Sequence, residues 1–152
     1  MKNLSIKQQL YNHCQALLNK RLETIRNTIF EIQKALESET KSSAGDKHET
    51  GRAMLQLERE KAGQQLAEVQ KLQEILQKVD YKSKHKRVGL GSIVFTSKQH
   101  YFISISAGEF EIDNTNYFAI SVVTPIAKEL LGKTKGDTFS FRNSIFTVIK
   151  VL

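Results

Sequence analysis

Two runs of apolar residues at heptad spacing are the feature that most limits how this chain can fold. In the first run the apolar residues are separated by 4, 3, 4, 3 and 4 positions: Leu18, Leu22, Ile25, Ile29, Ile32 and Leu36. The second run starts weakly and then becomes regular: Leu55, Ala62, Leu66, Val69, Leu72, Leu76 and Val79. Such a stripe repeats along one side of an α-helix, and a helix buries it by packing against a partner. The first run therefore predicts one helix of about 35–40 residues.

A single reversal of the chain near residue 47 brings the two stripes together. It places Leu18 near Leu76 and Ile32 near Ala62, with three further apolar pairs between them. The intervening segment SETKSSAGDKHETGR (38–52) is rich in small polar residues and Gly, which favour turns and helix caps over helix interiors. We therefore expect an antiparallel coiled-coil hairpin over residues 1–80 with its tip near 42–50.

After residue 80 the hydrophobic period changes from 3.5 to 2, which is typical of strands. Residues 81–87 form a short basic linker. Residues 88–152 contain six strand candidates and one short helix, which begins at Thr124-Pro125 and ends at Gly132. The fold class predicted is α+β: the helical hairpin followed by a small antiparallel β-sheet domain with one short helix.

Charge and composition narrow the functional classes. The net charge is +7, and Lys82, Lys84, Lys86 and Arg87 cluster near the expected root of the hairpin. Such a cluster suits a nucleic acid or an acidic protein surface, although a solubilising hinge is the plainer interpretation. The single Cys14 favours a reducing compartment, and no apolar stretch reaches the roughly 20 residues that span a bilayer. We expect a cytoplasmic protein with no membrane partner.

Two segments of the chain carry specific motifs, ISVVTPIAKELLGKTKGD (120–137) and GDKHET (45–50). Both resemble motifs of the bacterial Gre transcript-cleavage factors. The segment ISVVTPIAKELLGKTKGD (120–137) is similar to the family's I-S-x-x-S-P-[IL]-A-x-A-L-[IL]-G-K-x-x-G-D, with Thr124 where the family usually has Ser. The segment GDKHET (45–50) is similar to the family's tip G-D-L-S-E-N at its Gly, Asp and Glu. Together with the same domain order, the resemblance covers nearly the whole chain.

The resemblance implies a fold, a partner and a role. Gre factors bind RNA polymerase through a C-terminal domain of FKBP-like fold, and their hairpin enters the secondary channel of the polymerase. There the tip carboxylates help to hold a catalytic Mg²⁺ while the polymerase cleaves its own backtracked RNA. Carried over, Asp46 and Glu49 hold Mg²⁺ shared with the polymerase. The basic cluster is expected to contact polymerase or RNA because of its charge and not because of the resemblance: Lys82, Lys84, Lys86 and Arg87. The chain is then an accessory factor, not an enzyme, with no cofactor of its own and no small-molecule substrate.

Alternatives remain open at the tip. Asp46 and Glu49 also fit a capping box that starts the second helix, and both roles are compatible. Lys47 and His48 replace an apolar and a small residue of the family, and a cation beside the carboxylates weakens the field that attracts Mg²⁺. The chain could therefore bind in the channel and inhibit or modulate the polymerase without cleavage. It could also be a coiled-coil module that binds another protein.

Two enzymatic or metal-binding interpretations are weaker. The four His residues lack the spacing of zinc ligands. An FKBP-like domain suggests prolyl isomerase activity, but a fold alone does not establish a function, and the chain has no Trp for the floor of such a pocket. The alternating Phe residues of 88–152 are interpreted as core.

Overall fold

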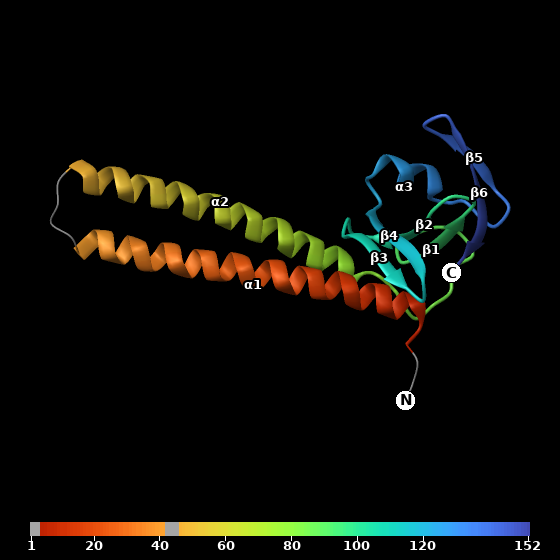
Figure 1. The fold of residues 1–152 in the computed structure, drawn as a ribbon, viewed down its shortest axis with the longest axis horizontal. Coiled ribbons are helices and arrows are strands. Elements are labelled where there is room, and N and C mark those ends of the chain that lie inside the picture. Colours follow the sequence, from red (N-terminus) through yellow and green to blue (C-terminus); the bar gives the residue numbers. More distant parts are fainter. Residues whose placement is uncertain (1–3, 42–45) are drawn as a thin grey trace. The chain divides into compact units, whose positions relative to one another are not determined.

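The computed structural model confirms the fold class, a long helical hairpin followed by a six-stranded sheet and a short helix (Figure 1). It describes the backbone of residues 4–41 and 46–152, and the side chains of these residues except 40, 41 and 46–49. The elements are α1 (Ile6–Lys41), α2 (Asp46–Gln77), β1 (Ile93–Thr96), β2 (His100–Ser104), β3 (Gly108–Ile112), β4 (Thr115–Ser121), α3 (Pro125–Leu130), β5 (Thr138–Phe141) and β6 (Ser144–Val151). They pack into two compact units, Leu18–Gln73 and a second that joins Met1–Leu17 to Glu74–Leu152.

In the unit Leu18–Gln73, the heptad stripes predicted from the sequence face inward. Leu18, Ile32, Ala62 and Val69 are buried. The remaining members in this unit are half-buried: Leu22, Ile25, Ile29, Leu36, Leu55, Leu66 and Leu72. The individual cross-helix pairs stay a prediction, and so does the tip near 42–50, because residues 42–45 lie outside the described residues.

Burial along α2 is uneven, which predicts uneven stability. No side chain from 50 to 61 is buried, and Met54 and Leu57 are 59% and 66% exposed. From residue 62 to 73, Ala62 and Val69 are buried at 3% and 5% exposure. Because local opening is easiest where few apolar groups are buried, we expect amides of 53–60 to exchange with deuterium faster than those of 65–72. Native-state hydrogen exchange measures this difference, and equal protection of both segments would contradict it.

The sheet has the strand order β3-β4-β2-β1-β6-β5. One pairing differs from the antiparallel sheet predicted from the sequence: β2 and β4 are parallel, with Tyr101 opposite Phe118. The chain leaves β2, forms β3, and turns back at Asp113-Asn114, so that β4 lies between β2 and β3. All other neighbouring strands are antiparallel. Strand periodicity in the sequence indicates strands but not which of them become neighbours.

The sheet has a core on each face. On one face, Val94, Ile103 and Val148 pack with Leu130 of α3 and with Phe139. The helix α3 begins as predicted, since the Thr124 side chain accepts a hydrogen bond from the Ala127 N–H and Pro125 follows it. The other face includes Phe102, which pairs through the backbone with Ile93 and is fully buried.

The first turns of α1 pack against the sheet within the same unit. Leu10 and Cys14 are fully buried, and the Cys14 Sγ lies 3.8 Å from the Ser104 Oγ. His13 stacks on Phe110 of β3 with ring centroids 5.0 Å apart. Burial raises the pKa of the Cys14 thiol to about 11, against a smaller lowering by the Ser104 hydrogen bond. The thiol is therefore protonated at neutral pH, as a packing residue and not a nucleophile.

Candidate functional site

The two carboxylates expected to carry the chemistry belong to the first turn of α2. The helix begins at Asp46, and Glu49 follows three positions later. Residues three apart lie on the same side of a helix, so both positions share one side at its N-terminal end. The geometry of the two side chains lies outside the described residues. Carboxylate oxygens are the hard ligands that Mg²⁺ prefers, and Mg²⁺ often takes only one or two of them.

The basic segment 82–87 has a fixed local backbone. The Asp80 carboxylate accepts hydrogen bonds from the N–H groups of Lys82 and Ser83, at 2.9 and 3.1 Å. A hydrogen bond from the Ser83 side chain lowers the pKa of Asp80 most. Together with the two backbone hydrogen bonds, it lowers that pKa to about 2. Lys82, Lys84, Lys86 and Arg87 are exposed. Arg87 donates to the Gly132 carbonyl oxygen at 3.2 Å, so it is turned toward the end of α3.

A buried lysine holds this segment against α1. The Lys7 ammonium donates to the Ser83 carbonyl oxygen at 2.6 Å, and the residue is only 6% exposed. Burial lowers the pKa of Lys7, and the charge of Asp80 opposes that shift. Gly91 lies close to the backbone of Asp80. It has a φ of 95°, and a Cβ there would lie 3.0 Å from the Asp80 carbonyl oxygen, so the position favours glycine. Sequence reasoning missed Lys7, because a lysine in an amphipathic helix carries no signal of burial.

His85 lies beside Ser92 in the same unit, and its pKa is shifted by its surroundings. Its Nδ1 lies 2.8 Å from the Ser92 Oγ. Burial, and then the positive charge of Lys7, lower the pKa of His85 below its ordinary value of 6.5, against the charge of Asp80. The unfolded chain therefore takes up this proton at a higher pH than the folded chain does.

We expect the free energy of unfolding to fall as the pH drops from about 6.5 through the lowered pKa of folded His85. Asp80 contributes a separate loss of stability at lower pH. Its pKa is 3.8 in the unfolded chain and about 2 in the folded chain, so this loss begins only below about pH 4. Urea denaturation of the full chain at pH values from 5 to 7.5 measures the slope. His85→Asn keeps a hydrogen-bonding group near Ser92 but removes the titrating imidazole, so it should flatten the dependence of the free energy of unfolding on pH. An identical slope in the variant would assign the pH dependence to other groups.

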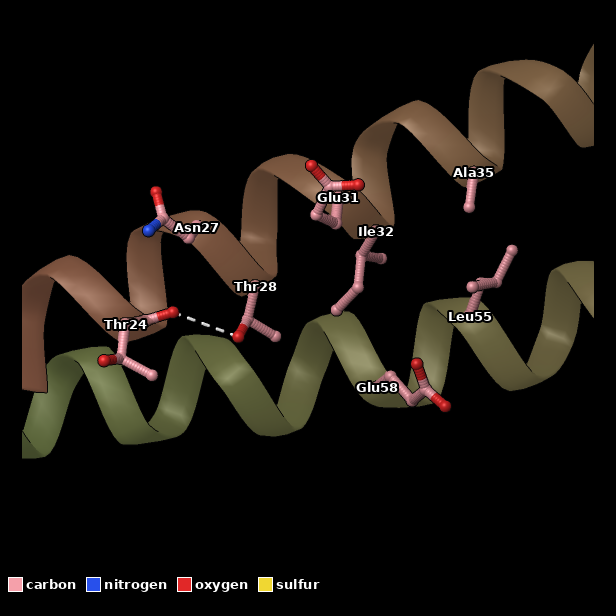
Figure 2. A pocket seen from close by; sticks show the side chains of 8 residues that line it. All are labelled: Thr24, Asn27, Thr28, Glu31, Ile32, Ala35, Leu55 and Glu58. Carbon is pink, nitrogen blue, oxygen red and sulfur yellow. Dashed lines mark hydrogen bonds between the residues drawn. The ribbon is translucent and has the colours of Figure 1, made fainter.

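A hollow lies between α1 and α2 in the unit Leu18–Gln73 (Figure 2). Its volume is about 530 Å³, and Ile32 and Leu55 point into the space between the helices. Glu31 and Glu58 stand on different helices at its edges. The hollow forms because the first part of α2 has few large apolar residues that could fill the space between the helices. Glu58 and the small Ala62 stand there instead. We interpret the hollow as a packing gap.

A second hollow of about 330 Å³ lies on the α3 side of the sheet. Its walls are mostly aromatic and aliphatic: Tyr101, Phe118, Ile120, Ile126, Phe141 and Phe146, with Gln99, Arg142 and Ser144 at the same hollow. We call it the aromatic cleft. Sequence reasoning assigned the Phe residues to the core. That is right for Phe102, Phe139 and Phe146, which are at most 8% exposed, but Phe118 and Phe141 are only half-buried.

In the ranges that the structure describes, no three His, Cys, Asp or Glu residues are grouped so that they could hold a metal ion. Within those same ranges, no helix combines the length and apolar character needed to cross a membrane.

Three chains of solved structures match this chain. No family model matches the sequence, and no curated protein matches it. A solved structure of the transcription factor Gfh1 aligns over 93% of this chain and 92% of that chain, with 19% identity and a TM-score of 0.34.

Proposed function

We propose that this chain is a Gre-type accessory factor of bacterial RNA polymerase that inserts its helical hairpin into the secondary channel. The observation that carries the proposal is the hairpin itself. Helices of 36 and 32 residues are separated only by residues 42–45, and Asp46 and Glu49 open the second of them. The motif over residues 120–137 supports the same assignment from the other end of the chain.

The chain's own contribution to the reaction is position and charge. Mg²⁺, when bound at the polymerase active site, activates water and stabilises the leaving oxygen of the RNA phosphate. Asp46 and Glu49 would supply carboxylate oxygens to that ion from one side of α2. The N-terminal end of a helix carries the positive end of its dipole, which attracts negative charge. The nascent RNA is then a partner only indirectly, through the polymerase.

The exposed lysines of the basic segment have a separate role in this proposal. Lys82, Lys84 and Lys86 would contact an acidic surface of the polymerase or the RNA backbone. Arg87 is the weakest member, because its guanidinium is already engaged with the Gly132 carbonyl oxygen.

In a second candidate function the partner is again RNA polymerase, but the chain inhibits the polymerase instead of stimulating cleavage. Lys47 and His48 place a cation and an imidazole between the two carboxylates in sequence. A positive charge there weakens the attraction of the tip for Mg²⁺, so the chain would occupy the channel and inhibit the polymerase.

A transcript assay on a stalled, backtracked elongation complex distinguishes cleavage stimulation from inhibition. Addition of the full chain should shorten the RNA from its 3′ end under the first proposal. Under the second it should slow both extension and intrinsic cleavage. If the chain leaves both rates unchanged at saturating concentration, both proposals are wrong.

A further inference from the structure

We propose that the face of the sheet opposite α3 binds single-stranded RNA, with bases stacked on Phe95 and His100 and a phosphate group held by Lys150. The inference rests on the proposed function only in taking RNA, and not single-stranded DNA, as the carrier of the bases. The stacking surface itself is argued from the sheet alone.

One row of side chains crosses five neighbouring strands on this face. Val94 packs with α3, so its neighbour Phe95 points to the opposite face. Paired residues of neighbouring strands point to the same face of a sheet. The register pairs each member of the row with the next, across β6, β1, β2, β4 and β3: Lys150, Phe95, His100, Tyr117 and Phe110. We call these five residues the cross-strand row.

The members of the cross-strand row are close enough to interact. The ring centroids of Phe95 and His100 are 4.9 Å apart, and the Lys150 ammonium lies 5.7 Å from the Phe95 centroid. At the other end of the row, the Phe110 ring already stacks on His13 of α1. The part of the row that is left for a ligand is therefore the end formed by Lys150, Phe95 and His100.

Exposure supports the same end of the row. Phe95 and His100 are half-buried and Lys150 is exposed, whereas Tyr117 is only 2% exposed. A half-buried ring is held in place by the sheet and still presents apolar surface to water, which a stacked nucleobase would cover. Sheet faces with aromatic side chains on neighbouring strands bind the bases of single-stranded RNA in a common class of RNA-binding domains.

The imidazole of His100 adds little to the stability of the sheet through its Nδ1 atom. That atom is buried, and among the residues that the structure describes it has no hydrogen-bond partner. An unpaired buried polar atom costs stability, and an aliphatic side chain at this position would avoid that cost. What the imidazole does supply is a flat ring beside Phe95 on which a base can stack.

The charges around the row favour an anion at its Lys150 end. Lys150 is an exposed cation, and so is Lys98 in the turn that joins β1 to β2. A negative charge acts at the other end, where burial and then the charge of Asp113 raise the pKa of Tyr117. The phosphate groups of RNA would therefore lie on the side of Lys150 and Lys98. Rings combined with cations fit a nucleic acid better than an apolar protein segment.

The test compares two fluorescein-labelled probes of equal length with the full chain. One probe is an unstructured single-stranded RNA of mixed sequence, and the other has the same ribose-phosphate backbone without bases. Fluorescence anisotropy measures both affinities. The basic segment 82–87 attracts the phosphates of both probes equally, so the difference between them reports stacking. We expect the RNA with bases to bind about tenfold more tightly.

Two aromatic substitutions locate the stacking surface. His100→Leu removes a ring and keeps an apolar side chain, so RNA should bind about tenfold more weakly, while the thermal midpoint stays the same or rises. Phe141→Leu removes the ring of a half-buried residue that packs with the core on the α3 face, and it should leave RNA affinity unchanged. Circular dichroism checks that each variant is folded. If His100→Leu is unfolded, Phe95→Leu replaces it, with the same expected loss of affinity.

A charge substitution tests the phosphate contact. Lys150→Gln should reduce the slope of the logarithm of the RNA association constant against the logarithm of the salt concentration by about 0.7. Lys128→Gln makes the same change of net charge at an exposed position on α3 and should leave the slope unchanged.

The inference is overturned if the two probes bind equally, if the ring substitutions on the two faces weaken binding equally, or if Lys150→Gln leaves the salt slope unchanged. Because polymerase is absent from this assay, such results leave polymerase binding by the full chain untouched. Conversely, RNA binding on this face by a chain that does not bind polymerase would support the inference and refute the proposed function.

Discussion

Replacing Asp46 with Asn should abolish stimulation of transcript cleavage, with a loss of at least about 100-fold. Mg²⁺ contributes several kcal/mol to charge stabilisation in such a transition state, and an amide cannot supply the anionic ligand. The stability of the hairpin should change by less than about 0.5 kcal/mol, because Asn serves at a helix N-terminus about as well as Asp does. The cleavage rate of a backtracked complex and the urea midpoint of the free chain give the two quantities.

The control for this substitution is Glu60→Gln on the same helix. Glu60 is an exposed carboxylate further along α2, and its loss removes the same charge from the chain. Cleavage should persist in this control. If Asp46→Asn retains full activity, the carboxylate acts only in starting the helix.

Leu76→Ala should lower the free energy of unfolding by about 2–5 kcal/mol. Leu76 is fully buried in the last turns of α2, within the unit that contains the sheet. Truncation removes apolar contacts and leaves a cavity that the fixed surroundings cannot fill. Chemical denaturation of the full chain at pH 7 measures the change.

Leu57→Ala is the matched control on the same helix. Leu57 is 66% exposed, so its truncation should shift the free energy of unfolding by no more than about 0.5 kcal/mol. Equal losses in the two variants would mean that burial at Leu76 does not stabilise the fold as described.

The hairpin was predictable because its signal is repeated along the chain. Six apolar residues at heptad spacing, from Leu18 to Leu36, add to the same stripe, and the second stripe continues to Val79. All these side chains are buried or half-buried. The short helix α3 was predictable for a different reason: Thr124 and Pro125 are a local start signal.

The features that sequence reasoning missed depend on contacts between distant residues. Lys7 donates a hydrogen bond to Ser83, which lies 76 positions away in the sequence, and no local sequence pattern predicts that contact. The parallel pairing of β2 with β4 depends on how the sheet closes and not on strand periodicity. The aromatic cleft is likewise assembled from β2, β4, α3 and the β5–β6 turn, so Phe118 and Phe141 were indistinguishable from core residues.

The most direct test of the account is whether the full chain forms a complex with bacterial core RNA polymerase. Gel filtration of a mixture at micromolar concentrations, followed by denaturing electrophoresis of the fractions, measures it. The account predicts that the chain elutes with the polymerase in near-equal molar amount. Elution of the chain entirely apart from the polymerase, in a preparation that is folded by circular dichroism, would contradict it.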